Sequence, residues 1–508
     1  MTAQGVNINI LDDQLGQVPP GQGPTQFVIG CSSGSTVSSS STVGSFGVYT
    51  SNNPSAFSAN SGYGPGPRLA AFMANLTGNP VGFVKVPSTT PGTVSAIYPT
   101  AGNGGTSVMT VTGTPNDDYY LVAKNLLAGT IGTGPVQLGI SIDGGATYPW
   151  IVNMGTATNV TTGSAFTLYT GLTLSFTSAA QSLGDSYYGV CAAPLWSQAS
   201  VQSAIQAAAA IKSIQFQDIM VAGLASASDV TAFDGYMTTL ANTNKRFSRM
   251  LVTTNDITWG GASTQSEAAW LSALQTSYAN SSSLRVGVCA GHYRFLDPFT
   301  QSQLRSSLIY GAASRDAGVA IQVDLGEVDM GNLQGLLLPP TPDAFGNGTF
   351  VYHDEQQTPG LDAARFLTAW QIVGLPGVYI MNPNLMAPPG SDFNWLQHGH
   401  VIDSACCIAY AYFIQKISSS VRVSATTGFI LPQDRARLQA GCNAQLGNQL
   451  VTPNAVSSAV CVVSGTDNIL STATLTVSLQ IVPLGYVKAV NVTISFLNPA
   501  VVAVQNQT

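Results

Sequence analysis

The chain has 508 residues, of which 45% are hydrophobic and only 8% are charged. Soluble domains are usually about a quarter charged, so much of this surface must consist of Ser, Thr, Asn, Gln and Gly, which costs little to desolvate. The formal net charge of -7 argues against a general basic surface for nucleic acid. The length suggests about three domains, and the composition favours a subunit that buries much of its surface against copies of itself.

Seven cysteines, an odd number, are scattered along the chain without a CxxC pair or metal-ligand spacing. Free thiols buried in a cytosolically assembled protein fit this distribution better than a disulfide framework. The N-terminus has no basic region followed by an apolar one, and the longest strongly apolar run, Ala405 to Ile414, is too short for a bilayer. We therefore expect neither a signal peptide nor insertion into a membrane. The cysteines are Cys31, Cys191, Cys289, Cys406, Cys407, Cys442 and Cys461.

Residues 1–24 are predicted to form an extended arm. Val6, Ile8 and Ile10 alternate with asparagines, which is the period of a half-buried strand, and a stretch rich in Pro and Gly follows. Beyond the arm, a buried strand, a helix that begins near a proline and a second strand predict a β-α-β unit. These three elements are Gln26 to Cys31, Pro67 to Asn75 and Val81 to Val86.

From about Pro91 to Val190 the helical period disappears, and alternating runs with many Gly and Thr residues take its place. Asp143-Gly144 between two such runs is a strong hairpin signal. This stretch therefore predicts an all-β domain inserted into the α/β body. The alternating runs are Val108 to Thr112, Val136 to Ile142 and Phe166 to Phe176.

Strands and helices alternate again from Ser197 onward, which predicts a largely parallel sheet covered by helices on both faces. The predicted helices are an Ala-rich one from Ser197, Ala232 to Ala241, Ser266 to Tyr278 and Gln303 to Ala313. The predicted strands are Asp218 to Ala222, Arg249 to Thr254 and Leu284 to Ala290. After a proline-rich crossing, three further helices are predicted at Leu361 to Ile372, Val401 to Lys416 and Gln433 to Leu446.

The last fifty residues are predicted to form strands, the final one with nothing after it to pack against. Between Ala473 and Ile481, the apolar residues Leu475, Val477 and Leu479 alternate with polar ones. After the Pro483-Leu484-Gly485 break the alternation returns with Val490, Val492, Ile494 and Phe496. A protein with an unshielded apolar strand at both ends either aggregates or donates those strands to neighbours, and donation would make it the subunit of a polymer.

Candidate sites for chemistry are weak. His353-Asp354 with His398-Gly399-His400 suggests a metal site, but on a strand the last two imidazoles would point to opposite faces. Asp324, Glu327 and Asp329 could form a cation site, although a turn between strands explains them as well. No GxSxG, GxGxxG or GxxxxGK[ST] motif follows a strand. We therefore assign no catalytic, cofactor-binding or metal-binding residue and expect no enzyme, although an α/β hydrolase or nucleotide enzyme with an added β module remains the alternative.

The predicted helix at Gln433 to Leu446 begins with charged residues in a chain that has few of them. Asp434 in the first turn complements the helix dipole, whereas Arg435 and Arg437 follow it and Lys416 and Arg422 precede the helix. These residues could simply form a solvated face. They could instead contact an acidic partner polymer, in which case the contact should weaken with salt.

Four stretches of the chain together resemble the contractile tail sheath proteins of bacterial viruses and related injection machines. The resemblance covers both ends and the last third of the chain, whereas Pro91 to Val190 matches nothing in that family. The stretches are VPPGQGPTQFVIGCSSG (Val18 to Gly34), HDEQQTPGLDAARFLTAWQIVGLPGVYIMNPNLMAPPGSDF (His353 to Phe393), SSVRVSATTGFI (Ser419 to Ile430) and NILSTATLTVSLQIVPLGYVKAVNVTISFLNP (Asn468 to Pro499).

The resemblance implies a multidomain α/β subunit with an inserted all-β domain and a conserved C-terminal α+β assembly domain. Val6 to Ile10 and Val490 to Phe496 would be strands donated to neighbouring subunits, and Ala459 to Val463 with Ala473 to Ile481 would receive them. Gln433 to Leu446 would face the inner tube. The implied parts are an N-terminal arm (1–24), an α/β body (25–90 and 191–345), the β insertion (91–190), an assembly domain (346–488) and a C-terminal arm (489–508).

The resemblance also implies partners and a place of action. The chain would form a helical homopolymer around a tail tube protein, between a baseplate and a tail terminator, without nucleic acid or cofactor. It would be assembled in the host cytoplasm, reside in the virion tail and contract during genome ejection. A bacteriocin-like particle, a capsid protein or a surface-layer protein remain alternatives.

Overall fold

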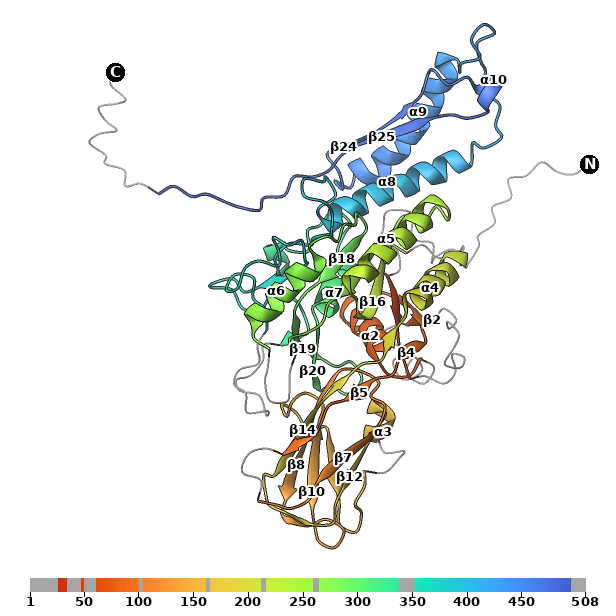
Figure 1. The fold of residues 1–508 in the computed structure, drawn as a ribbon. Coiled ribbons are helices and arrows are strands. Elements are labelled where there is room, and N and C mark those ends of the chain that lie inside the picture. The colour runs from red at the N-terminus through yellow and green to blue at the C-terminus, as the bar shows by residue number, and fades with distance from the viewer. Residues whose placement is uncertain are drawn as a thin grey trace, which may run out of the picture.

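The computed structural model describes residues 26–33, 47–49, 61–99, 104–160, 165–211, 216–258, 265–337 and 352–494 (Figure 1). At its centre lies a six-stranded sheet in the order β18-β17-β16-β1-β3-β2, parallel except for β2. Its long strands are buried on both faces, which explains why they are continuous apolar runs in the sequence. The bounds are β1 Gln26–Gly30, β2 Gly47–Tyr49, β3 Val81–Lys85, β16 Asp218–Leu224, β17 Arg249–Thr253 and β18 Val286–Cys289.

Helices cover both faces of this sheet, as the alternation of strands and helices predicts. Phe27 and Ile29 of β1 point into the core beneath α4, α5 and α6, whereas Val28 points to the opposite core beneath α2 and α7. The side chains of Ser197, Ser226 and Ser266 cap the N-termini of α4, α5 and α6, respectively. The bounds are α2 Pro65–Thr77, α4 Gln198–Ala210, α5 Ala227–Asn242, α6 Glu267–Tyr278 and α7 Ile309–Gly318. The predicted mixed α/β fold is confirmed.

The segment between β3 and α4 forms antiparallel sheets with a core of their own, at one end of the molecule (Figure 1). The main sheet has the order β11-β10-β8-β14-β5, and β6 also pairs with β14. The chain leaves and re-enters the body side by side, through the antiparallel pair β4 and β15. The bounds are β4 Ser88–Thr90, β5 Thr93–Val94, β6 Tyr98–Pro99, β7 Met109–Gly113, β8 Tyr119–Leu127, β9 Gly129–Thr130, β10 Gln137–Ser141, β11 Trp150–Asn153, α3 Ala165–Thr170, β12 Leu172–Phe176, β13 Ala180–Gln181, β14 Ser186–Ala192 and β15 Leu195–Trp196.

Arg68 of α2 joins this β segment to the body. Its buried guanidinium contacts Asp117 beside β8, the Asp297 carboxylate at 3.1 Å and the Tyr169 hydroxyl at 2.9 Å. Burial raises the pKa of Asp117 to about 7, although the charge of Arg68 opposes this shift. A single arginine therefore holds three segments together, so its removal would leave carboxylates buried without a partner.

The C-terminal part lies at the opposite end of the molecule from the β segment (Figure 1). A three-stranded antiparallel sheet in the order β20-β19-β21 and the pair of β22 and β23 precede it. A long helix then leads into a second helix and a two-stranded hairpin with a separate core. The bounds are β19 His292–Leu296, β20 Gln303–Ser307, η2 Val328–Met330, β21 Leu336–Leu337, β22 Ala369–Trp370, β23 Tyr379–Ile380, α8 Leu396–Ile414, α9 Pro432–Leu446, η3 Gly447–Val451, β24 Ser458–Val463, α10 Ile469–Thr472 and β25 Val477–Val482. In the described ranges, no helix combines the length and apolar character needed to cross a membrane.

The helix predicted at Leu361 to Ile372 is wrong. The segment forms turns, in which Arg365 has a φ of 73°, and then runs extended beside β18. The backbone N–H of Leu367 donates to the Val288 carbonyl, and the N–H of Ala290 donates to the Leu367 carbonyl. Leu367 is fully buried in this position, so pairing with the sheet edge overrides the local helical pattern.

Four other predictions are wrong in whole or in part. The predicted helix Gln303 to Ala313 begins as strand β20 and becomes helical only in α7, because β20 pairs with β19. The predicted strand Phe166 to Phe176 begins with α3, and the strand assigned from Ala473 starts at Val477 because Ala473 has a φ of 50°. His398 and His400 lie on helix α8 and not on a strand.

Candidate assembly surface

The hairpin of β24 and β25 presents two different faces. Cys461 and Val463 of β24 and Val477, Leu479 and Ile481 of β25 pack toward α8 and α9. The opposite face is open, with exposed side chains at Val460, Val462 and Val482. The antiparallel register pairs Cys461 with Leu479 and Val463 with Val477. We use the name C-terminal unit for residues 396–482, which contain α8, α9 and this hairpin.

Side chains of α9 cover the outer edge of β24. The backbone N–H of Cys461 donates to Oδ1 of Asn443 at 2.6 Å, and that of Val463 donates to Oε1 of Gln439 at 3.4 Å. These N–H groups therefore point away from β25. An edge strand whose donors are already occupied is a poor template for another strand.

The outer edge of β25 is open. Residues opposite each other in an antiparallel pair face the same way, so the backbone groups of Val477, Leu479 and Ile481 also point away from the partner strand. The bond from the Ser464 N–H to the Thr476 carbonyl agrees with this register. Across the described ranges, no hydrogen bond reaches the N–H or C=O of these three residues. The hairpin thus offers one free edge at which a further strand can pair.

Beyond Lys488 the chain continues as an exposed apolar arm. Val490, Val492 and Ile494 are 75%, 75% and 88% exposed, and the described residues after Val482 form no strand. In Figure 1 this segment passes the start of α8 and continues away from the molecule. Phe496, the last apolar residue of the predicted strand, lies outside the described residues, as do Val6, Ile8 and Ile10 of the N-terminal arm.

Two residues that sequence reasoning missed fix the root of this arm to the body. The Tyr486 hydroxyl donates to the Gln322 carbonyl at 2.6 Å, and Nζ of Lys488 lies 2.5 Å from Oδ2 of Asp324. Lys488 also lies over the Trp395 ring, 5.0 Å from its centroid. The arm therefore leaves the subunit in a defined direction, from Lys488 onward. In the sequence, these contacts could have been suspected only from Tyr486 and Lys488 standing two residues apart in an otherwise apolar stretch.

Helix α8 connects the C-terminal unit to the central sheet. Asp403 lies 2.7 Å from Nε of Arg249 at the start of β17 and 3.3 Å from Nη1 of Arg285. Nε2 of His400 lies 2.8 Å from Oδ1 of Asp218 at the start of β16. These buried groups bind the first half of α8 to the body, whereas its second half packs on α9. The helix has 19 residues and is therefore a strut about 28 Å long.

Three of the predicted tube-facing residues, Arg422, Asp434 and Arg437, lie together at the start of α9. Arg422 donates to Asp434, with Nε 3.0 Å from Oδ2, and Nη2 of Arg437 lies 3.9 Å from the same carboxylate. Hydrogen bonds from the side chain and backbone of Arg422 lower the pKa of Asp434 to about 2. Asp434 itself is buried, so it orients the arginines and does not reach solvent. Arg435 is half-buried, and Nζ of Lys416 lies over the Tyr412 ring, 5.3 Å from its centroid.

This end of the molecule has the opposite charge to the rest. Residues 410–483 contain the four basic residues named above and two acidic ones, a net charge of +2 in a chain whose total is -7. Arg422 and Arg437 are exposed, with 63% and 68% of their side chains accessible. The start of α9 is therefore a small basic surface on an acidic protein.

The candidate metal ligands are held in hydrogen-bonded networks. His353 is buried between Glu267, 2.9 Å from Nδ1, and Glu355, 2.8 Å from Nε2. Burial lowers the pKa of His353, but the two glutamates outweigh burial and raise it overall. Asp324 is occupied by Lys488, whereas Glu327 and Asp329 are exposed to solvent, so the three carboxylates form no shared site.

One group of possible metal ligands lies together in the described chain: Asp218, Asp316 and His400. However, Nε2 of His400 lies 2.8 Å from Asp218, whereas Nδ1 lies 3.8 Å from Asp316. The two ring nitrogens therefore face different carboxylates. Nε2 of Gln26 also lies between the carboxylates, 3.4 Å from Asp218 and 3.1 Å from Asp316. Burial raises the pKa of Asp218 to about 7. His400 and Gln26 therefore link the two buried carboxylates.

The chain belongs to the DUF2586 family, because the model of the DUF2586 N-terminal domain matches residues 3–384. No curated protein matches it. The solved structures that match include the sheath tail protein from Desulfitobacterium hafniense, at 11% identity and a TM-score of 0.43, covering 94% of this chain and 100% of that one.

Two further matches were solved by electron cryo-microscopy. The contracted helical sheath of the anti-feeding prophage has 9% identity and a TM-score of 0.49, with 97% of this chain and 99% of that one covered. The contracted PVC sheath complex of an extracellular contractile injection system has 12% identity and a TM-score of 0.41, with 61% of this chain and 76% of that one covered. These matches are sheath proteins, the class that the sequence resembles.

Proposed function

We propose that the chain is the structural subunit of a contractile sheath that polymerises by exchanging strands between neighbours. The observation that carries this proposal is the exposed apolar arm at Val490 to Ile494 in a subunit whose β25 edge is open. Adding the arm of one subunit to the β25 edge of another would satisfy the free backbone groups and cover the arm. The sequence resemblance set out above indicates which polymer this is.

The energetics favour a mesh and not isolated pairs. Burying Val490, Val492 and Ile494 contributes roughly 5 to 9 kcal/mol at about 1.5 to 3 each. Fixing the backbone of the five residues from 490 to 494 costs about 5 to 10 kcal/mol. A single arm is therefore near balance, and assembly depends on several contacts per subunit acting together. We therefore expect the subunit to stay monomeric at low concentration and to assemble cooperatively above a critical concentration.

The joint at α8 supports a mechanical role. In this proposal the arms keep neighbours connected, while each body moves as a rigid unit from an extended to a contracted helix. The ion pairs of Asp403 with Arg249 and Arg285 make the body and the C-terminal unit turn together. The flexible element would then be the chain after Lys488, where the arm leaves the subunit.

The inner partner in this proposal is an acidic tail tube. The basic surface at the start of α9 suits such a partner, and an electrostatic contact would allow the sheath to slide on the tube without a large hydrophobic interface. The baseplate and the tail terminator would bound the polymer, in the tail of a virion assembled in the host cytoplasm or in a bacteriocin-like particle. The domain limits implied by the resemblance are part of the same proposal.

Deletion of Ala489 to Thr508 tests the proposal. The truncated chain should remain folded and soluble, with an unchanged circular dichroism spectrum, but should form no tubes by electron microscopy under conditions in which the full chain does. Tubes formed by the truncated chain would refute strand donation by this arm. Flat lattices of the full chain would favour a surface layer, closed shells a capsid, and a purely monomeric chain with turnover of a substrate an enzyme.

A further inference from the structure

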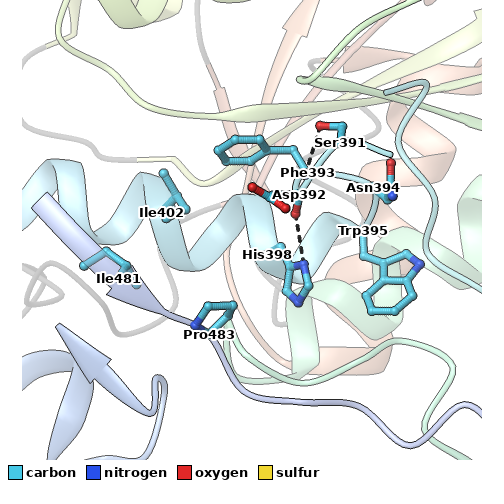
Figure 2. A pocket seen from close by; sticks show the side chains of 9 residues that line it. All are labelled: Ser391, Asp392, Phe393, Asn394, Trp395, His398, Ile402, Ile481 and Pro483. Carbon is cyan, nitrogen blue, oxygen red and sulfur yellow. Dashed lines mark hydrogen bonds between the residues drawn. The ribbon is translucent and has the colours of Figure 1, made fainter. Parts of the chain in front are cut away.

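A pocket lies where the C-terminal end of β25 meets the first half of α8 (Figure 2). Its volume is about 430 Å³, within the range of roughly 300 to 1,000 Å³ found for concave binding sites. Ile402 of α8 lies across from Ile481 and Pro483 at the end of β25, with Trp395 on another side (Figure 2). The pocket is thus mainly apolar and lies at the C-terminal end of β25. Its remaining lining residues are Ser391, Asp392, Phe393, Asn394 and His398.

The spacing of apolar residues in the arm matches that of β25 and of the pocket. On β25 the residues facing the core are Val477, Leu479 and Ile481, and Pro483 follows at the same interval of two. The arm carries Val490, Val492, Ile494 and Phe496 at that interval. If a neighbour's arm lies parallel to β25 with residue 490 beside 477, then residue 494 lies beside 481. The next residue on that face, Phe496, is then at the pocket.

The opposite direction gives Phe496 no such site. With the arm antiparallel, residue 490 would lie beside Ile481 and residue 496 beside Leu475, before the start of the strand. That position lies at the opposite end of β25 from the pocket lined by Ile481 and Pro483. An aromatic ring gains the most from burial in a concave apolar site, so the pocket favours the parallel direction.

We infer that the pocket is the anchor site for Phe496 of a neighbouring subunit, whose arm pairs parallel to β25. The described chain ends at Ile494, two residues before Phe496, so the occupant is the segment that directly follows the exposed arm. This inference rests on the proposed strand exchange and deepens it, because it sets the direction and register of the exchange. The pairing of a single arm is near balance in free energy, and burial of Phe496 in the pocket would stabilise it and fix its register.

A double-mutant cycle tests the anchor. Phe496→Ala should raise the critical concentration for tube formation by roughly tenfold or more, as expected for an aromatic side chain that loses its burial. Ile402→Ala, which widens the pocket, should raise it less and should add little in the double variant. Thr493→Ala, on the other face of the arm, and Ile414→Ala, which lies on α8 outside the pocket, are the matched controls and should change little. Additive effects of the first two substitutions would overturn the anchor.

Disulfide trapping in assembled tubes tests the direction. The pair Ile481→Cys with Ile494→Cys should give a ladder of linked chains on a non-reducing denaturing gel, because each subunit donates one arm and receives another. The pair Ile481→Cys with Val490→Cys should give none, and a ladder from this pair alone would establish antiparallel pairing and overturn the inference. A link formed within one chain, without a ladder, would also overturn it.

The inference and the proposed function fail in different ways. If Phe496→Ala assembles like the parent chain while deletion of residues 489–508 abolishes tubes, the anchor is wrong and strand exchange stands. If the deletion also assembles normally, the proposed function itself is wrong.

Discussion

If a neighbour's strand pairs with the open edge of β25, the contribution of its backbone hydrogen bonds to assembly can be measured apart from that of side-chain packing. Proline at position 479 removes a backbone N–H that faces away from β24, so the Leu479→Pro variant should keep the hairpin but lose a donor needed by the incoming strand. Leu479→Ala is the matched control, because it removes the same side chain and keeps the N–H. The difference between the two variants therefore isolates the edge.

The expected magnitude follows from the geometry. One hydrogen bond contributes about 0.5 to 1.5 kcal/mol, and the proline ring also keeps the incoming strand at a distance. Together these effects should exceed about 1.4 kcal/mol, which corresponds to a tenfold higher critical concentration than that of Leu479→Ala. The measurement is sedimentation of tubes over a concentration series, with urea unfolding of the monomer as a check on folding.

A second proline variant serves as a control, because it should damage the hairpin itself and not only its outer edge. The N–H of Gln480 faces β24, so Gln480→Pro should break the hairpin ladder and lower the urea midpoint of the monomer. If Leu479→Pro and Leu479→Ala assemble at the same concentration, the outer edge of β25 carries no strand and the reasoning is refuted.

Further predictions concern the ion networks. Arg68→Met should destabilise the monomer by roughly 3 to 5 kcal/mol, since it leaves buried carboxylates unpaired, and adding Asp117→Asn should recover part of that loss in urea unfolding. The raised pKa of His353 means that its stabilisation is complete below the ordinary value of 6.5 and is lost as pH rises through the folded value. The unfolding free energy should therefore fall over that range, and His353→Gln should remove this part of the slope. Replacing Arg435 and Arg437 with Glu should abolish assembly on the tube and leave self-assembly intact; co-sedimentation with tubes at low and high salt measures both, and unchanged tube binding would contradict the basic contact.

Local patterns predicted much of this fold. The β-α-β start, the alternation from Ser197 to Ala290 and the helix at Gln433 to Leu446 were correct, because buried parallel strands and amphipathic helices leave a period in the sequence. The hairpin at Asp143-Gly144 was also correct, but the signal there was the turn dipeptide and not a period: the antiparallel strands β10 and β11 pair on either side of it. The failure at Leu361 to Ile372 has the opposite cause, since pairing with β18 decides that segment and is not visible locally.

The sequence by itself determined that apolar and polar residues alternate strictly from Val490 onward, because alternation is a property of the chain alone. Only the tertiary structure decided which edge could receive such a strand. Asn443 and Gln439 of α9 close the edge of β24, and nothing in the described chain closes that of β25. The pocket beside Ile481 likewise exists only because α8 and β25 meet there. Edges and pockets depend on contacts between segments that are distant in sequence, and so no local pattern can reveal them.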